Sequence, residues 1–326
     1  MATTEFYLGR KSKFLYAIEN SYGVANPATT WSWGGFVQSF NSNDSQSLQR
    51  LDGMDGENRR LVGEYYPLVP QYGASIEIIP QHLRMAYLAM GKEQHSTGTH
   101  TLTVGEELPS FCIQAGHIHT TDTFGKQPVG CVFGSMNFNW NQGDFFRITG
   151  ELRAQNISKI TSFKNYQTTN TAQKKYTSEQ MRPFKGSDSK FFINNIDISP
   201  YVLQASIALD NDLDIVGSLD NADNGLIAEP VPQVQTQTAT LTVKMKESDL
   251  WDLWKAGNTV NNCTFQLNRG VNDTVDFNLS GVKIEAANEP INVLEGIVIQ
   301  ELNLQMTELE IVEENSITTP YATKES

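Results

Sequence analysis

The stretch from Thr238 to Gly257, TATLTVKMKESDLWDLWKAG, predicts a β-strand that leads directly into an α-helix. Apolar and polar residues alternate from 241 to 245, which is the period of a half-buried strand. The apolar residues then change to helical spacing from 248 to 256, after Ser and Asp residues suited to cap a helix N-terminus. Gly257 is typical of a helix end.

The same pattern occurs about 166 residues earlier, where Gly73 to Gly91 reads GASIEIIPQHLRMAYLAMG. The flanking segments extend the match, since FVQSF at 36–40 corresponds to VLQAS at 202–206. The remaining correspondences are GMDGENRRLVGE at 53–64 with GSLDNADNGLIAE at 217–229, and FFRITGELRA at 145–154 with IVIQELNLQMT at 297–307. We interpret the chain as an internal duplication. Two copies are too few for a solenoid, so we expect each copy to have its own core.

The composition argues against nucleic-acid binding, a disulfide framework, a zinc site and a membrane span. The chain has 326 residues, 10% of them aromatic, and a net charge of −13. We do not expect so acidic a chain to bind nucleic acid directly, because phosphate binding requires Lys and Arg. Its three cysteines have no CxxC spacing, which argues against disulfides and zinc. It has no apolar run of transmembrane length and no signal-peptide pattern at the start. We therefore expect a protein used inside a cell or carried in a particle, with no membrane partner.

The predicted fold class is mainly β, with two tandem domains of the β-sandwich or open-barrel type, each flanked by one α-helix. The predicted boundaries are 1–153 for the first domain, 154–190 for a basic linker or arm, 191–312 for the second domain and 313–326 for a loose polar tail. Helices are expected near 81–90 and at 248–256, and a polar turn at 93–100. Strands are expected at 101–104, 110–114, 130–140, 145–155, 201–209, 237–245, 263–267, 274–284 and 293–308.

The side chains that could carry chemistry do not form a convincing site. His117, His119 and Asp122 could offer three metal ligands, but a solvated strand edge explains them better. The aspartates from 210 to 214 lack the glycine and glutamate of a calcium loop. No pattern of nucleophile, base or phosphate-binding loop occurs. We predict no enzyme, no cofactor and no metal.

Four segments, taken in their order along the chain, resemble the tail-tube proteins of tailed bacterial and archaeal viruses. They are KFLYAIENSYGVAN at 13–26, the segment 217–229, DLWDLWKAG at 249–257 and GIVIQELNLQMT at 296–307. The resemblance implies a β-sandwich domain with a flanking helix. Six such domains form a ring, rings stack into a hollow tube, and a long hairpin contacts the next ring. In this chain the hairpin positions would be 43–60 and 210–224.

This resemblance implies a structural protein of the virion tail, assembled in the host cytoplasm, through which viral double-stranded DNA passes without specific binding. A duplicated chain would close as a trimer with pseudo-sixfold symmetry. Its expected partners are further copies of itself and the tape-measure, tail-terminator and baseplate proteins. The acidic composition suits a DNA conduit, because a negative wall does not hold phosphates.

Two sets of charged residues are predicted to make contacts between subunits. The first set is expected at the junction of two rings and consists of Asp210, Asp212, Asp214, Asp220, Asp223, Arg59 and Arg60. The second set lies in the arm, whose net charge is +5 over 154–190, and consists of Lys164, Lys174, Lys175 and Arg182. We expect the arm to be unable to fold alone and to become ordered on assembly, with aromatic residues as anchors.

Two alternatives remain open on sequence alone. The first is a duplicated β-sandwich that binds carbohydrate or protein through exposed aromatic residues, with Trp31, Trp33, Tyr65 and Tyr66 as candidates. The second is the tube subunit of a contractile secretion machine with the same fold. A binding module predicts a monomer with a ligand groove, whereas both tube proteins predict rings.

Overall fold

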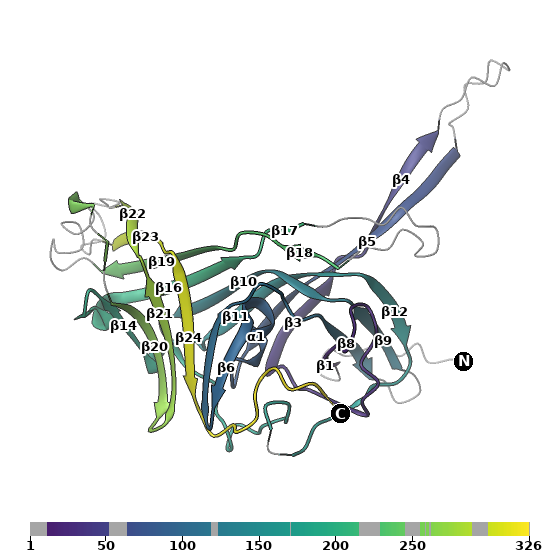
Figure 1. The fold of residues 1–326 in the computed structure, drawn as a ribbon, viewed down its shortest axis with the longest axis horizontal. Coiled ribbons are helices and arrows are strands. Elements are labelled where there is room, and N and C mark those ends of the chain that lie inside the picture. The colour runs from purple at the N-terminus through teal and green to yellow at the C-terminus, as the bar shows by residue number, and fades with distance from the viewer. Residues whose placement is uncertain are drawn as a thin grey trace, which may run out of the picture.

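The computed structural model describes residues 12–51, 64–118, 123–169, 171–214, 229–244, 255–257, 259–260, 262–288 and 299–325. These residues form mainly β structure, as predicted, around the helix α1 (Arg84–Met90) (Figure 1). Within them, no helix is both long and apolar enough to cross a membrane.

One large sheet runs through the whole molecule and contains strands from both halves of the chain (Figure 1). Its strands pair antiparallel throughout. In spatial order they are β22 (Lys283–Asn288), β23 (Ile299–Gln305), β19 (Thr236–Lys244), β16 (Val202–Asp210), β10 (Val132–Asn141), β11 (Arg147–Ala154), β5 (Glu64–Ile79) and β3 (Phe36–Ser42), and β4 (Ser45–Leu51) pairs with the N-terminal part of β5. The halves join where β10 pairs with β16.

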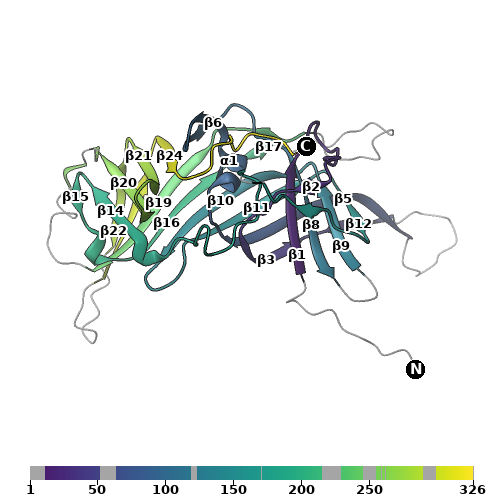
Figure 2. The same cartoon turned by 90° about the horizontal axis from the view of Figure 1, so that it is seen from below.

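Two further sheets lie at opposite ends of the molecule (Figure 2). The four-stranded sheet has the order β1 (Ser12–Ile18), β8 (Phe111–Ile118), β9 (Thr123–Val129) and β12 (Asn156–Ile160). The seven-stranded sheet has the order β15 (Ile196–Asp197), β14 (Ser189–Ile193), β20 (Cys263–Gly270), β21 (Asp273–Ser280), β24 (Glu308–Glu314), β7 (Thr99–Val104) and β6 (Gly91–Ser96). Two short pairs complete the structure, β2 (Thr30–Trp31) with β13 (Asn165–Tyr166) and β17 (Leu213–Asp214) with β18 (Val231–Pro232).

The main hydrophobic core extends across both halves. The residues that alternate in the two sequence repeats point into it, with Ile76 and Ile78 from one repeat and Leu241 and Val243 from the other all buried. Trp140 of the first half packs against aromatic rings of the second. The expectation of a separate core for each copy is therefore not met, because the residues around β10 and β16 bury their apolar surface in common.

The first predicted helix is present as α1. It starts after Pro80 has ended β5, since proline cannot continue the ladder, and it ends at Gly91 in the left-handed conformation with φ 88°. All seven helical residues are buried, so α1 lies within the core rather than flanking it. Of the second predicted helix, 255–256 are helical, and most of it lies outside the described residues.

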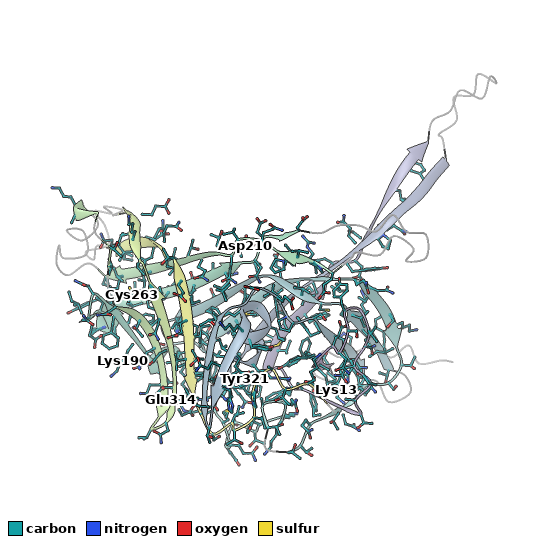
Figure 3. The ribbon with its side chains drawn as sticks, in the orientation of Figure 1. Lys13, Lys190, Asp210, Cys263, Glu314 and Tyr321 are labelled. Carbon is teal, nitrogen blue, oxygen red and sulfur yellow. The ribbon has the colours of Figure 1, made fainter. Side chains whose placement is uncertain are left out.

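The segment from 313 to 325 is not a loose tail, which corrects the prediction. Glu313 belongs to β24, and Ile317 and Tyr321 have 1% or less of their surface exposed. Tyr321 lies in the interior, stacked on His100 with ring centroids 3.9 Å apart (Figure 3). The segment is polar in composition, but its polar groups find buried partners, which sequence pattern cannot reveal.

The arm is also ordered within the single chain, contrary to the prediction. Its first part forms β12 on the edge of β9, and β13 pairs with β2. Tyr176 and Phe184 are buried, as expected of anchors, and Phe184 contacts Phe146 at 6.5 Å between centroids. These contacts supply the apolar burial that the composition of the arm did not suggest.

The predicted turn at 93–100 is instead most of a β-hairpin. Strands β6 and β7 pair from Gly91 to Val104, and β7 then pairs with β24 of the second half. The hairpin has polar residues because β6 is the edge strand of its sheet. Strands β9 and β12 were not predicted at all.

Candidate assembly surface

The large sheet ends in two unlike edges. In the described part of the chain β3 pairs with no strand beyond β5, and β22 with none beyond β23. An unpaired strand edge presents N–H and C=O groups that can pair with another chain. The two edges are therefore candidate assembly surfaces, because the edge of one copy could pair with the other edge of a neighbouring copy.

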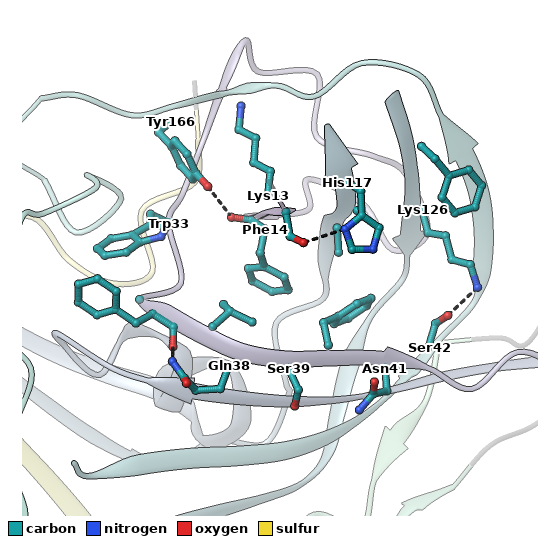
Figure 4. A pocket seen from close by; sticks show the side chains of 18 of the residues that line it. Lys13, Phe14, Trp33, Gln38, Ser39, Asn41, Ser42, His117, Lys126 and Tyr166 are labelled. Carbon is teal, nitrogen blue, oxygen red and sulfur yellow. Dashed lines mark hydrogen bonds between the residues drawn. The ribbon is translucent and has the colours of Figure 1, made fainter. Parts of the chain in front are cut away.

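A groove of about 900 Å³ lies along β3, between this strand and the ends of β1 and β8 (Figure 4). Its walls carry aromatic residues, including Phe14 and Phe40, whose ring centroids are 5.7 Å apart. On β8 the lining residues are the small Ala115 and Gly116, followed by His117. We call this feature the β3 groove.

Among the residues that the structure describes, three lysines and no carboxylate line the β3 groove. Tyr166 of the arm lies between two of them. Its ring centroid is 5.0 Å from Lys13 Nζ and 4.9 Å from Lys175 Nζ. Burial and the neighbouring charge of Lys175 lower the pKa of Lys13. Lys126 is paired with Asp44. The groove is thus lined by aromatic side chains, neutral polar side chains and lysines.

Asp210 and β17, at the start of the predicted acidic loop, lie on the side of the molecule from which β4 and β5 project (Figures 1 and 3). Asp210 accepts a hydrogen bond from the backbone N–H of Asp212 at 3.0 Å, and the buried Asn211 anchors the loop by donating to Ala89 and Phe133 carbonyls. Asp210 and Asp212 share a shallow surface with Asn43 at the base of the projecting strands. Asp214 belongs to β17.

Asp220, Asp223, Arg59 and Arg60 lie outside the described residues. The structure thus brings the start of the acidic loop and the base of the first predicted hairpin together. Whether these residues contact a neighbouring ring stays a prediction.

The predicted arm residues all have contacts within their own chain. Lys164 donates to the Pro27 carbonyl at 3.3 Å, and Arg182 pairs with Asp188 at 2.6 Å. Lys174 lies over the Tyr176 ring at 5.2 Å, and Lys175 lies over Trp33 as well as Tyr166. Contact with a neighbouring subunit through these side chains stays a prediction.

A buried polar network that the sequence did not indicate holds the segment 315–325 against α1. Arg84 pairs with Glu325 at 2.8 Å and donates to the carbonyl oxygens of Tyr321 and Thr323. Glu313 accepts hydrogen bonds from the Leu83 N–H and from the Tyr321 hydroxyl. The Arg84 and Glu325 charges are paired and hydrogen-bonded, which is the condition for burying charge. Burial raises the pKa of Glu313. No local pattern could have revealed these pairs, since their partners are more than 200 residues apart in all but one case.

This geometry gives little support to the carbohydrate- or protein-binding module or to the metal site that were considered from the sequence. Trp31 and Trp33 are buried, so they are not the exposed aromatics of a binding platform, whereas Tyr65 is 56% exposed. His117 Nδ1 lies 2.8 Å from the Ser12 hydroxyl, and His119 and Asp122 lie outside the described residues. Within the part of the chain that can be placed, no three His, Cys, Asp or Glu side chains are grouped to hold a metal.

Comparison with known proteins identifies one family. The family model described as "Phage tail tube protein" matches residues 9–306 of the chain. The tail tube of SPP1, solved by solid-state NMR and cryo-EM, is similar at 10% sequence identity with a TM-score of 0.33, over 48% of this chain and 80% of that one. No curated protein matches.

Proposed function

This chain belongs to the phage tail tube protein family, and on that premise we propose that three copies close head to tail into a ring with pseudo-sixfold symmetry. Membership makes the chain a structural component of the virion tail that self-assembles into a tube. The number of chains, the way they join and the surfaces between rings are the parts that we infer here.

The observation that carries the proposal is a repeated order of strands in the large sheet. Each half contributes four strands, and β3, β5, β11 and β10 of the first half occupy the same relative places as β16, β19, β23 and β22 of the second. The irregularities of the ladder repeat as well. A bulge follows Val37 in β3 and Val202 in β16, and another follows Phe133 in β10 and Ile284 in β22. This agreement supports the internal duplication.

The junction between the halves serves as a template for the junction between chains. Within the chain β16 of the second half pairs with β10 of the first. The two edges of the sheet are the equivalents of these strands, since β3 corresponds to β16 and β22 to β10. Pairing β22 of one copy with β3 of the next repeats the internal junction. Such a heterologous contact forms a ring when the rotation closes.

The count of three follows from the family arrangement of six single domains around the lumen. Two repeats in one chain fill two of six positions, so three chains complete the ring. Each chain would add eight strands to a continuous inner sheet.

The face of the large sheet opposite the core is suited to line the lumen. Its side chains are mainly hydroxyls and amides, for example Ser206 hydrogen-bonded to Thr240 at 2.5 Å and Asn139 donating to Thr149. The charges present include the pair Arg147 with Glu77 at 2.6 Å. A wall made mainly of neutral polar groups offers few cations to phosphates, so viral DNA can pass without being held.

The axial contacts would come from the side where β4, β5 and the loop after β16 lie. We infer that these features meet the next ring, with the aspartates of the loop facing basic residues there. At the two ends of the tube, we expect these axial surfaces to meet the tape-measure, tail-terminator and baseplate proteins during assembly in the host cytoplasm.

The test is the mass and shape of the assembled protein. Native mass spectrometry of the purified chain should give trimers and their stacks, and electron microscopy should show rings with pseudo-sixfold symmetry. Rings of six chains, or a protein that stays monomeric at high concentration, would overturn the proposal.

A further inference from the structure

The space that forms the β3 groove in the first half is filled in the second half. Strands β14 and β20 occupy the places in their sheet that β1 and β8 occupy in theirs. In the second half Trp140 enters this space from β10. Its ring centroid lies 6.3 Å from Phe191 on β14, 5.9 Å from Phe265 on β20 and 5.0 Å from Phe277.

The first half has the walls of this site without the inserted side chain. Phe14 on β1 and Phe40 on β3 remain, whereas β8 carries Ala115 and Gly116 beside the groove. A space of about 900 Å³ is left between them, although the interiors of proteins are normally packed to high density. The difference suggests that its occupant comes from another copy of the chain.

We propose that the β3 groove receives the residues at the end of β22 of a neighbouring copy, which insert there as Trp140 inserts into the second half. The proposal rests on the head-to-tail ring and adds to it the site, the register and the charges of the contact. The occupant is a second copy of this chain.

The register follows from the internal junction. There Asn137 of β10 lies opposite Ala208 of β16. Counting through the repeated ladders, Asn137 corresponds to Asn288 at the end of β22, since their partners Thr149 and Glu301 occupy equivalent places. Ala208 corresponds in the same way to Asn43, which donates its backbone N–H to Gly73. Asn288 of one copy should therefore lie opposite Asn43 of the next.

The charges of the two surfaces are complementary. Within the described part of the chain the groove is lined by Lys13, Lys126 and Lys175 and by no carboxylate, and of these lysines Lys126 already pairs with Asp44. The sequence from 283 to 301 contains four glutamates and one lysine. Opposite charges across an interface speed association and fix its register, and they make it sensitive to salt. An acidic partner in the groove would offset the repulsion between the two neighbouring lysines, Lys13 and Lys175, and so stabilise the contact.

The first experiment fills the groove from within the chain. Ala115→Trp should occupy the space without a neighbour, so the protein concentration at half-maximal ring formation, measured by light scattering, should rise by at least about tenfold. The control is Val271→Trp at an exposed turn, which should assemble normally. Circular dichroism and the thermal midpoint establish that each variant is folded.

The second experiment does not depend on tolerance of a bulky side chain. Asn43→Cys combined with Asn288→Cys should give, on oxidation, covalent ladders that end at the closed ring, while Val271→Cys combined with Asn288→Cys should give none. Lys175→Glu should weaken ring formation and reduce its salt dependence, and Lys190→Glu on the distant β14 should do neither.

The outcomes separate this inference from the ring itself. If the unmodified chain forms no rings, the head-to-tail proposal is wrong. If rings form, but Ala115→Trp assembles as well as the unmodified chain and the Asn43 and Asn288 positions do not cross-link, the ring stands and the groove is not the contact. Normal assembly of Ala115→Trp together with efficient cross-linking would retain the register and reject the insertion.

Discussion

At the residue scale, His82 is a side chain whose chemistry is strongly changed by the fold. It is buried between the rings of Tyr176 and Tyr321, and its Nδ1 accepts a hydrogen bond from the backbone N–H of Arg84 at 3.4 Å. Burial, followed by the positive charges of Arg84 and Arg269, lowers the pKa of His82 to about 3. The folded protein therefore keeps this imidazole neutral.

This shift predicts a loss of stability in mild acid. The unfolded chain protonates the imidazole near pH 6.5, whereas the folded chain does not until about pH 3. Between these values the unfolded state binds more protons, so the free energy of unfolding falls as pH falls, by at most about 1.4 kcal/mol per pH unit for this group. His82→Gln should flatten the fall in thermal midpoint between pH 7 and pH 5. The half-buried His117→Gln is the control, and an unchanged slope in His82→Gln would contradict the assignment.

At the element scale, the end of each predicted helix depends on a glycine. Gly91 has φ 88° and Gly257 has φ 64°, the left-handed region that disfavours a Cβ atom. Their surroundings differ, because a Cβ on Gly91 would lie 2.3 Å from the carbonyl oxygen of Glu107, whereas one on Gly257 meets no atom of the described residues within 4 Å. The two positions therefore separate backbone strain from steric conflict.

Substitution by alanine should reveal this difference. Gly257→Ala should cost only the conformational strain, about 1–2 kcal/mol. Gly91→Ala should cost about 1–3 kcal/mol more, because the chain must also move away from the Glu107 carbonyl. Urea denaturation of both variants measures the two values. Equal losses would mean that the loop at Glu107 yields freely.

The same scale shows which elements could be predicted from sequence. The strands around 76 and 241 have strong local periodicity, and their burial follows it. The helix α1 has helical spacing as well, but all seven of its residues are buried. Strand β9 contains Gly125 and Pro128, which locally disfavour a strand, and it forms because β8 and β12 pair with it on both sides. Strand β6 has the polar composition of a turn. It is an edge strand, and an edge strand can be polar throughout.

At the scale of the whole molecule, the sequence repeat indicated two similar units but not how they join. The pairing of β10 with β16 brings together residues about 70 positions apart, and neither strand carries a local signal for it. The β3 groove was hidden for the same reason, because Lys13, Phe40 and Lys175 meet only in the folded chain. The sequence predicted Lys175 as a contact for its charge and Trp33 as a candidate binding aromatic, whereas it did not single out Phe14 and Phe40.

The continuous core also predicts how a single chain unfolds. Trp140 lies among rings of the second half, and the hairpin β6–β7 of the first half extends the sheet of the second through β24. Unfolding one half would expose apolar surface of the other, so the dissociated monomer should unfold in one transition that does not depend on protein concentration. Tryptophan fluorescence and far-ultraviolet circular dichroism, followed in guanidinium at concentrations too low for rings, should give the same midpoint. Trp140→Ala should lower that midpoint while keeping the transition single. Two separate transitions in the unmodified monomer would show that the halves fold independently, despite the core and the sheet that they share.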